Sequence, residues 1–164
     1  LCIDTFLTGE YQHPRTGSSR KTFKFPDTFL PTDTAFRIHD IVTAAVFLRA
    51  ETGLPVTVTG LGGAGVWALF AAAVEPAIAG VVADTAGFDP SSDAQWVEKH
   101  YLPCIRSVGD LNTVAAMIAP RPVELIHCAD PGLWSGFQRA YANAAGTDGA
   151  LTMAGGAGST AASE

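Results

Sequence analysis

Residues 55–73 read P-V-T-V-T-G-L-G-G-A-G-V-W-A-L-F-A-A-A, and the rest of the chain is organised around this stretch. The β-branched run at 55–59 predicts a short buried strand. The glycines that follow allow a turn too tight for most side chains. The Ala- and Leu-rich residues 66–73 predict an apolar helix. The stretch therefore predicts a strand, a sharp glycine turn and a helix whose N-terminus faces out of the turn.

Two unrelated chemistries use this geometry. In a nucleophile elbow, G-x-S-x-G, a serine lies at the tip of the turn and backbone N–H groups help to bind an oxyanion. In a dinucleotide fingerprint, G-x-G-x-x-G, the bare backbone and the helix N-terminus hold a pyrophosphate. Gly62 occupies the nucleophile position of the elbow and has no side chain. Gly60, Gly62 and Gly65 match the fingerprint, and Asp84 ends the next predicted strand, where an acidic residue holds a ribose hydroxyl.

The composition is typical of a soluble globular protein with one domain. The chain has 164 residues, of which 48% are hydrophobic and 16% are charged, and this length suits a sizeable core. The net charge of −6 argues against a nucleic-acid surface, and no Lys/Arg cluster overrides that. No apolar run is long enough to cross a membrane. The three cysteines, Cys2, Cys104 and Cys128, form no metal-binding or disulfide pattern, so we predict core residues and no metal or cofactor.

Further apolar runs and turn signals extend the pattern of strands and helices. Thr32 or Asp33 begins a helix that Gly53 ends, as N-cap and C-cap preferences predict. Other strands are predicted at residues 1–7, 79–83, 123–128 and 150–153, and other helices at 110–118 and 133–145. Strands separated by helices indicate an α/β fold with an open, mostly parallel sheet flanked by helices. Ligands of such folds bind beyond the carboxyl ends of the strands.

The two ends of the chain carry separate expectations. The sequence begins inside a predicted strand, so we expect a processed or truncated product, part of a longer polypeptide. Residues 154–164 are rich in Gly, Ala, Ser and Thr and predict a flexible low-complexity tail after one domain at 1–153. Residues 11–31 predict a long solvated loop.

Three stretches also carry a resemblance to a known family. They are I-D-T-F-L-T-G-E at 3–10, D-I-V-T-A-A-V-F-L at 40–48 and D-L-N-T-V-A-A-M-I-A-P-R-P-V-E-L-I-H-C-A-D at 110–130. On these motifs, residues 1–153 resemble the C-terminal two-thirds of an α/β-hydrolase of the acetyl xylan esterase and dienelactone hydrolase type. The resemblance implies that Asp130 takes the position of the triad acid. It also implies that Gly62 takes the nucleophile position and that the Gly63 backbone N–H is half of an oxyanion hole.

The resemblance implies a carboxyl-ester hydrolase acting on small esters or acetylated carbohydrates, but a triad needs a nucleophile and a histidine base. Gly62 cannot attack a substrate, and no histidine follows His127, which either serves as a base beside Asp130 or points into the sheet layer. We therefore expect a catalytically degenerate, hydrolase-like domain that retains a binding cleft over Gly62. The alternative is an NAD(P)-binding module that uses the Gly60, Gly62 and Gly65 turn and Asp84.

Overall fold

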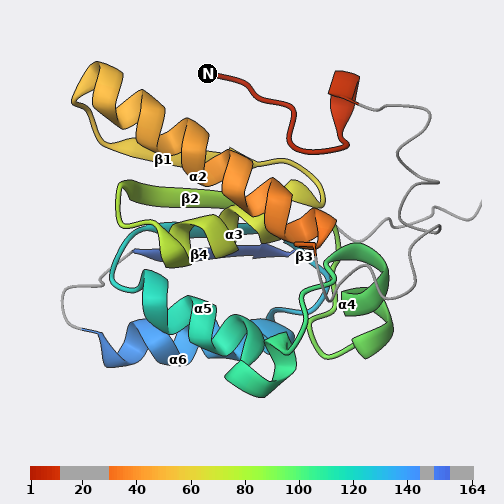
Figure 1. Ribbon diagram of the computed structural model, residues 1–164. Helices are drawn as coiled ribbons and strands as arrows, with labels where there is room; N and C mark the ends of the chain where they lie inside the picture. Colours follow the sequence, from red (N-terminus) through yellow and green to blue (C-terminus); the bar gives the residue numbers. More distant parts are fainter. Residues whose placement is uncertain (12–29, 145–149, 156–164) are drawn as a thin grey trace, which may run out of the picture.

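The computed structural model describes residues 1–11, 30–144 and 150–155. Its centre is a sheet of parallel strands in the order β1-β2-β3-β4, which is also their order in the chain (Figure 1). The strands are β1 (Val56–Gly60), β2 (Ile78–Asp84), β3 (Val123–Cys128) and β4 (Leu151–Gly155). This sheet confirms the predicted open α/β fold, and each of these strands lies within two residues of its predicted bounds.

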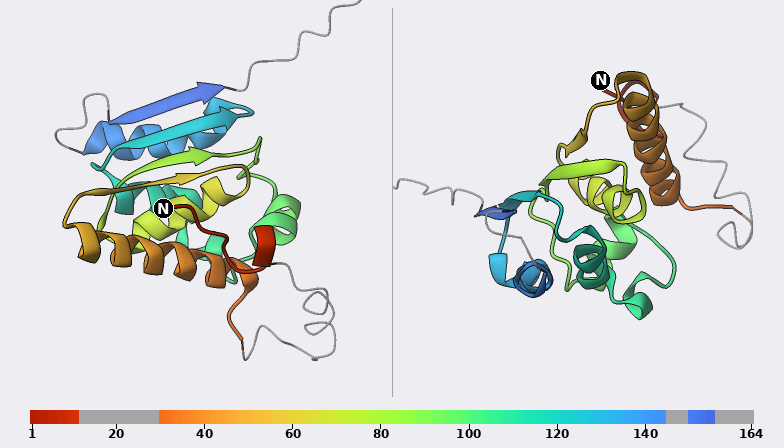
Figure 2. Two further views of the ribbon diagram at one scale, coloured as in Figure 1. Left: turned by 90° about the horizontal axis from the view of Figure 1, so that it is seen from above. Right: turned by 90° about the vertical axis from the view of Figure 1, so that its left-hand side faces the viewer.

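Helices connect the strands and cover the sheet from one side. They are α2 (Asp33–Thr52), α3 (Ala64–Val74), α4 (Asp93–Lys99), α5 (Asp110–Ile118) and α6 (Ser135–Asn143), with short 3-10 turns η1 (Gly9–Tyr11), η4 (Ile105–Val108) and η5 (Pro131–Trp134). In Figures 1 and 2, α3, α5 and α6 lie against one face of the sheet, and α2 runs beside β1 at the sheet edge. Within the described ranges no helix covers the opposite face. The carboxyl ends of the strands meet at one edge, beside α4.

The predicted capping residues delimit α2. The Thr32 side chain accepts a hydrogen bond from the Ala35 N–H at 3.2 Å, which satisfies one free donor of the first turn. Gly53 ends the helix in the left-handed conformation, with φ of 69°, and its N–H donates to the Arg49 carbonyl. The sequence therefore predicts both ends of α2 correctly.

The strand predicted at residues 1–7 is wrong. Residues 1–5 form neither strand nor helix, and Leu1 is 78% exposed. Side chains of α2 hold this segment, because the Phe6 N–H donates to Asp40 Oδ2 at 2.8 Å and Arg37 Nε donates to the Phe6 carbonyl at 3.0 Å. Apolar composition favours burial, but a strand also needs a neighbour for its backbone groups. No described strand pairs with these residues or with the outer edge of β1.

Two further expectations have different outcomes. Cys128 is buried as predicted, whereas Cys2 and Cys104 are exposed, so the prediction of three core cysteines is wrong for two of them. The solvated loop at 11–31 and the flexible tail at 154–164 fall almost entirely outside the described residues.

Candidate functional site

The glycine turn between β1 and α3 has a backbone donor, the Gly63 N–H, without an acceptor among the described residues. Gly62 has a left-handed φ of 56°, and no heavy atom lies within 4 Å of the position that its Cβ would occupy. Gly63 is the N-cap residue of α3 and has no side-chain cap, and its N–H donates to none of the described residues. The turn therefore presents open space over Gly62 and an unpaired N–H at the positive end of the α3 dipole.

Gly60 and Gly65 serve packing inside the protein. A Cβ on Gly65 would lie 2.0 Å from the Asp84 carbonyl oxygen, and a Cβ on Gly60 would lie 2.4 Å from the Ala64 carbonyl oxygen. Both contacts are with backbone, which cannot rotate away as a side chain can. These two glycines allow α3 to approach β1 and β2 closely, so their presence does not require a ligand.

Asp84 lies at the end of β2, and its carboxylate binds the backbone of the glycine turn. Its Oδ2 accepts the Gly62 N–H at 3.1 Å, and its Oδ1 accepts the Ala86 N–H at 2.8 Å and contacts His127 Nδ1 at 2.9 Å. Burial alone would raise the pKa of the Asp84 carboxyl, but the hydrogen bonds from Ala86, His127 and Gly62 outweigh it and lower the pKa. The carboxylate therefore occupies the Gly62 N–H that a pyrophosphate would use.

His127 pairs with Asp84 rather than with Asp130. Its side chain is 61% exposed, so it does not point into the sheet layer, and its backbone has a left-handed φ of 54°. Asp130 caps η5, because its Oδ1 accepts the Gly132 N–H at 2.8 Å. The structure thus brings together Gly62, Asp84 and His127 but gives Asp130 a turn-forming role. The assignment of Asp130 as a triad acid stays a prediction.

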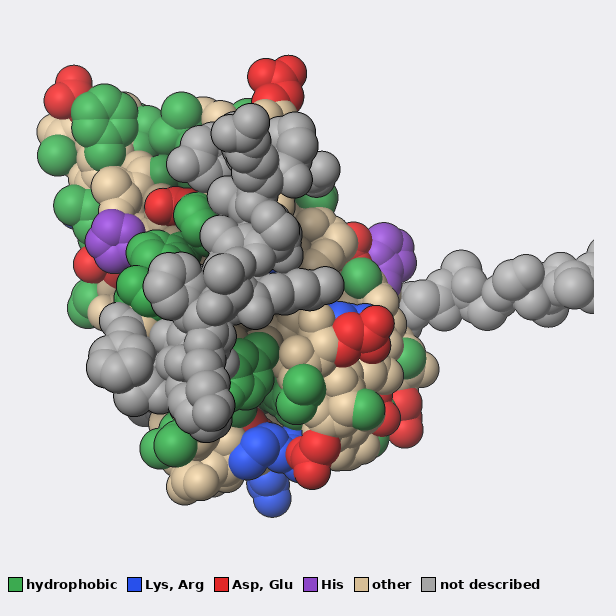
Figure 3. Space-filling model, turned by 45° about the vertical axis from the view of Figure 1, so that its right-hand side comes forward, with side chains coloured by type: hydrophobic (Ala, Val, Ile, Leu, Met, Phe, Trp, Pro, Cys, Tyr) green, Lys and Arg blue, Asp and Glu red, His purple; other side chains and the backbone are tan. Residues whose placement is uncertain are grey.

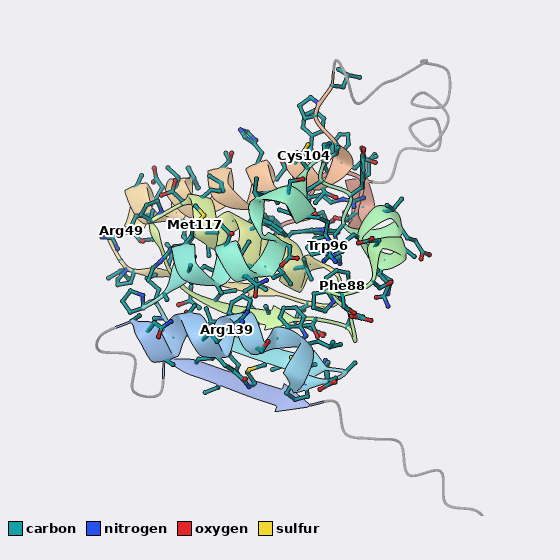
Figure 4. The ribbon with its side chains drawn as sticks, turned by 90° about the horizontal axis from the view of Figure 1, so that it is seen from below. Arg49, Phe88, Trp96, Cys104, Met117 and Arg139 are labelled. Carbon is teal, nitrogen blue, oxygen red and sulfur yellow. The ribbon has the colours of Figure 1, made fainter. Side chains whose placement is uncertain are left out.

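His100 lies beside the glycine turn, and sequence analysis assigned it no role. It is 2% exposed and follows α4, and its Nδ1 accepts a hydrogen bond from Trp67 Nε1 at 2.9 Å. The rings of Phe88 and Trp96 pack edge-on against it (both are labelled in Figure 4). Burial, the largest cause, and the positive charges of Lys99 and Arg37 lower the pKa of His100 to about 4.

The tautomer of His100 follows from its surroundings. A pKa of about 4 keeps the ring neutral at pH 7, and the nitrogen that accepts from Trp67 cannot carry the proton. The proton therefore lies on Nε2. Cys104, four residues later, is exposed and does not share this environment. The spacing of His100 and Cys104 does not reveal this environment, because Trp67 and Phe88, from separate segments, contribute to the burial of His100.

An apolar cavity of about 470 Å³ opens beside the turn. Its walls come from the N-terminal segment, α2, the outer edge of β1 and the start of α3. At the end nearest the turn the lining residues are Leu61, Gly63 and Trp67. The cavity thus adjoins the unpaired N–H of Gly63 and reaches the indole whose nitrogen donates to His100.

No protein-family model matches the chain, and no curated protein matches it significantly. Across the described ranges, no helix is both long and apolar enough to span a membrane. The described part of the chain also holds no cluster of three or more His, Cys, Asp and Glu residues suited to a metal ion. On the face shown in Figure 3, the visible Lys and Arg side chains form no broad patch.

Proposed function

We propose that this chain is an α/β-hydrolase-like domain that binds a small ester over the glycine turn without hydrolysing it. The observation that carries the proposal is the conformation of Gly62. It stands in the nucleophile position of an elbow with the left-handed φ of 56° and with open space where a side chain would point, yet it has no side chain. A ligand can fill that space, whereas no attacking group can.

The surroundings of the turn supply the two parts of such a binding site. The Gly63 N–H is an unpaired donor at the N-terminus of α3, suited to a carbonyl oxygen. The adjoining cavity is lined mainly by apolar groups, which suits a short acyl chain better than a sugar ring. An ester with a small apolar acyl group therefore matches both parts.

The dinucleotide alternative is less well supported. A pyrophosphate at the turn would have to displace the Asp84 carboxylate from the Gly62 N–H, or else lie beside its negative charge. Both carboxylate oxygens of Asp84 already have partners in the protein, so a ribose would compete with Ala86 and His127. Gly60 and Gly65 are explained by packing alone.

The experiment is a titration of the ¹⁵N-labelled protein with methyl butyrate, followed through its backbone amides. We expect a saturable shift of the Gly63 amide. The variant Gly62→Leu fills the open space and should abolish the shift. Gly53→Leu is the matched control, because Gly53 has a similar φ of 69° and equally open space but caps α2, away from the turn.

Hydrolysis is measured in parallel with 4-nitrophenyl butyrate. We expect no turnover above that of heat-denatured protein. Turnover that a serine-directed fluorophosphonate blocks would contradict the lack of a nucleophile. A titration with NAD completes the set: saturable NAD binding that Gly62→Leu weakens, with no response to methyl butyrate, would replace this proposal by the nucleotide-binding alternative.

A further inference from the structure

His100 carries a buried hydrogen-bond donor that the fold leaves unused. Its Nδ1 accepts from Trp67, so its Nε2 carries the proton, and Nε2–H donates to none of the described residues. His100 is only 2% exposed, yet Nε2 is not one of the unpaired side-chain atoms that have no contact with solvent. An unpaired buried N–H destabilises a protein unless water or a ligand accepts from it. The donor thus indicates a position for an acceptor from outside the chain.

The second unused donor of this region, the Gly63 N–H, lies next to the His100 ring. His100 Cε1 is 3.8 Å from the position that a Cβ on Gly63 would occupy. Cε1 lies between the two ring nitrogens, Nδ1, which accepts from Trp67, and Nε2. A Cβ at position 63 would be in ordinary van der Waals contact with the imidazole, and glycine leaves this space unfilled. The His100 ring, which carries one unused donor, therefore lies beside the residue that carries the other, at the N-terminus of α3.

We propose that the His100 Nε2–H and the Gly63 N–H together bind a carboxylate, the acid counterpart of the small ester proposed above. A carboxylate offers an acceptor oxygen to each donor, and hydrogen bonds to a charged acceptor are stronger than those to a neutral one. The N-terminus of an eleven-residue helix also favours negative charge. The site therefore prefers the acid to the ester.

The charges near this site favour the same ligand. Lys99 and Arg37 are the cations that act on His100, and the Arg37 guanidinium lies 4.5 Å from the centre of the Trp67 ring. The Asp84 carboxylate opposes an anion, but three donors of the protein already bind it. The apolar cavity beside Gly63 can hold the alkyl part of the acid.

This proposal rests on the proposed function because both place a ligand at the Gly62–Gly63 turn. The test uses sodium butyrate as the probe at pH 7. Nuclear magnetic resonance of the wild-type ring nitrogens should show His100 as the Nε2–H tautomer. Saturating butyrate should shift both the Nε2–H signal and the Gly63 amide. His100→Phe, which removes the donor, should weaken butyrate binding by roughly tenfold to a hundredfold, the range for a hydrogen bond to a charged group. His39→Phe, at an exposed position of α2, should leave it unchanged.

Four other results would overturn the proposal, and they show which part of it fails. If methyl butyrate binds and butyrate does not, the carboxylate site is wrong while the proposed function stands. If neither probe binds, both fail. Equal binding of butyrate by His100→Phe and wild type removes His100 from the site. If His100→Phe does not fold, the wild-type spectrum decides: an Nε2–H signal that saturating butyrate leaves in place refutes the proposal.

Discussion

Alanine substitutions in the glycine turn should have very unequal effects on stability. In Gly65→Ala the new Cβ would lie 2.0 Å from the Asp84 carbonyl oxygen and 2.6 Å from the Asp84 backbone carbon and nitrogen. Backbone surrounds this position, so α3 and β2 must separate, and we expect a loss of about 3 kcal/mol in the free energy of unfolding. In Gly62→Ala the new Cβ meets nothing within 4 Å, and only the left-handed backbone disfavours it, by about 1 kcal/mol.

Urea unfolding followed by tryptophan fluorescence measures this difference, because Trp67, Trp96 and Trp134 are all buried. With a slope of roughly 2 kcal/mol per molar urea, the midpoint should fall by about 1.5 M in Gly65→Ala and by about 0.5 M in Gly62→Ala. Gly53→Ala is the control and should behave like Gly62→Ala. Equal midpoints for the Gly62 and Gly65 variants would refute the division of the turn into packing and open positions.

Two other substitutions test the packing and the buried imidazole. Arg121 donates to five backbone carbonyls at the ends of α3 and α5 and the start of β2, so Arg121→Lys should lower the free energy of unfolding by about 3 kcal/mol in urea titrations. Arg139→Lys, on an exposed helix surface, should change it by less than about 0.5 kcal/mol, and equal losses would contradict this role. His100 has a lowered pKa, so the unfolded chain binds its proton first and stability should fall on the order of 3 kcal/mol as the pH drops from 6.5 to 4. The stability of His100→Phe should not change with pH in this way. The pKa of Asp84 is also lowered in the folded protein, so protonation of Asp84 should reduce stability only below about pH 3.8, outside this range.

The sequence predicted the parts of the fold that local chemistry determines. β3 (Val123–Cys128) has the predicted bounds because a β-branched and aliphatic run lies between a proline-rich turn and Asp130. Thr32 and Gly53 delimit α2 through caps that depend only on neighbouring residues. Residues 1–7 show the limit of such signals, because the apolar run has no described strand beside it.

The candidate site depends on contacts that the sequence does not encode locally. Asp84 and His127 meet because β2 and β3 are adjacent and parallel, with Asp84 in register with Ile126. The order of strands in a sheet does not follow from the composition of each strand. His127 also has a left-handed φ, which interrupts the alternation of side chains that would otherwise predict its direction. Pairing with Asp130, only three residues away, was therefore the expectation that sequence distance favoured.

The glycine turn shows why matching letters to a motif does not decide its chemistry. The same turn can be matched both to an elbow and to a dinucleotide fingerprint, but its backbone donors differ in what they already bind. The Gly62 N–H is held by Asp84, whereas the Gly63 N–H is unpaired. An elbow binds an oxyanion through the N–H of the residue after the nucleophile position, which here is Gly63. A fingerprint needs bare backbone along the whole turn for the pyrophosphate. The distribution of bonded and unpaired donors therefore supports the proposal of an elbow-like turn without its nucleophile over the nucleotide-binding alternative.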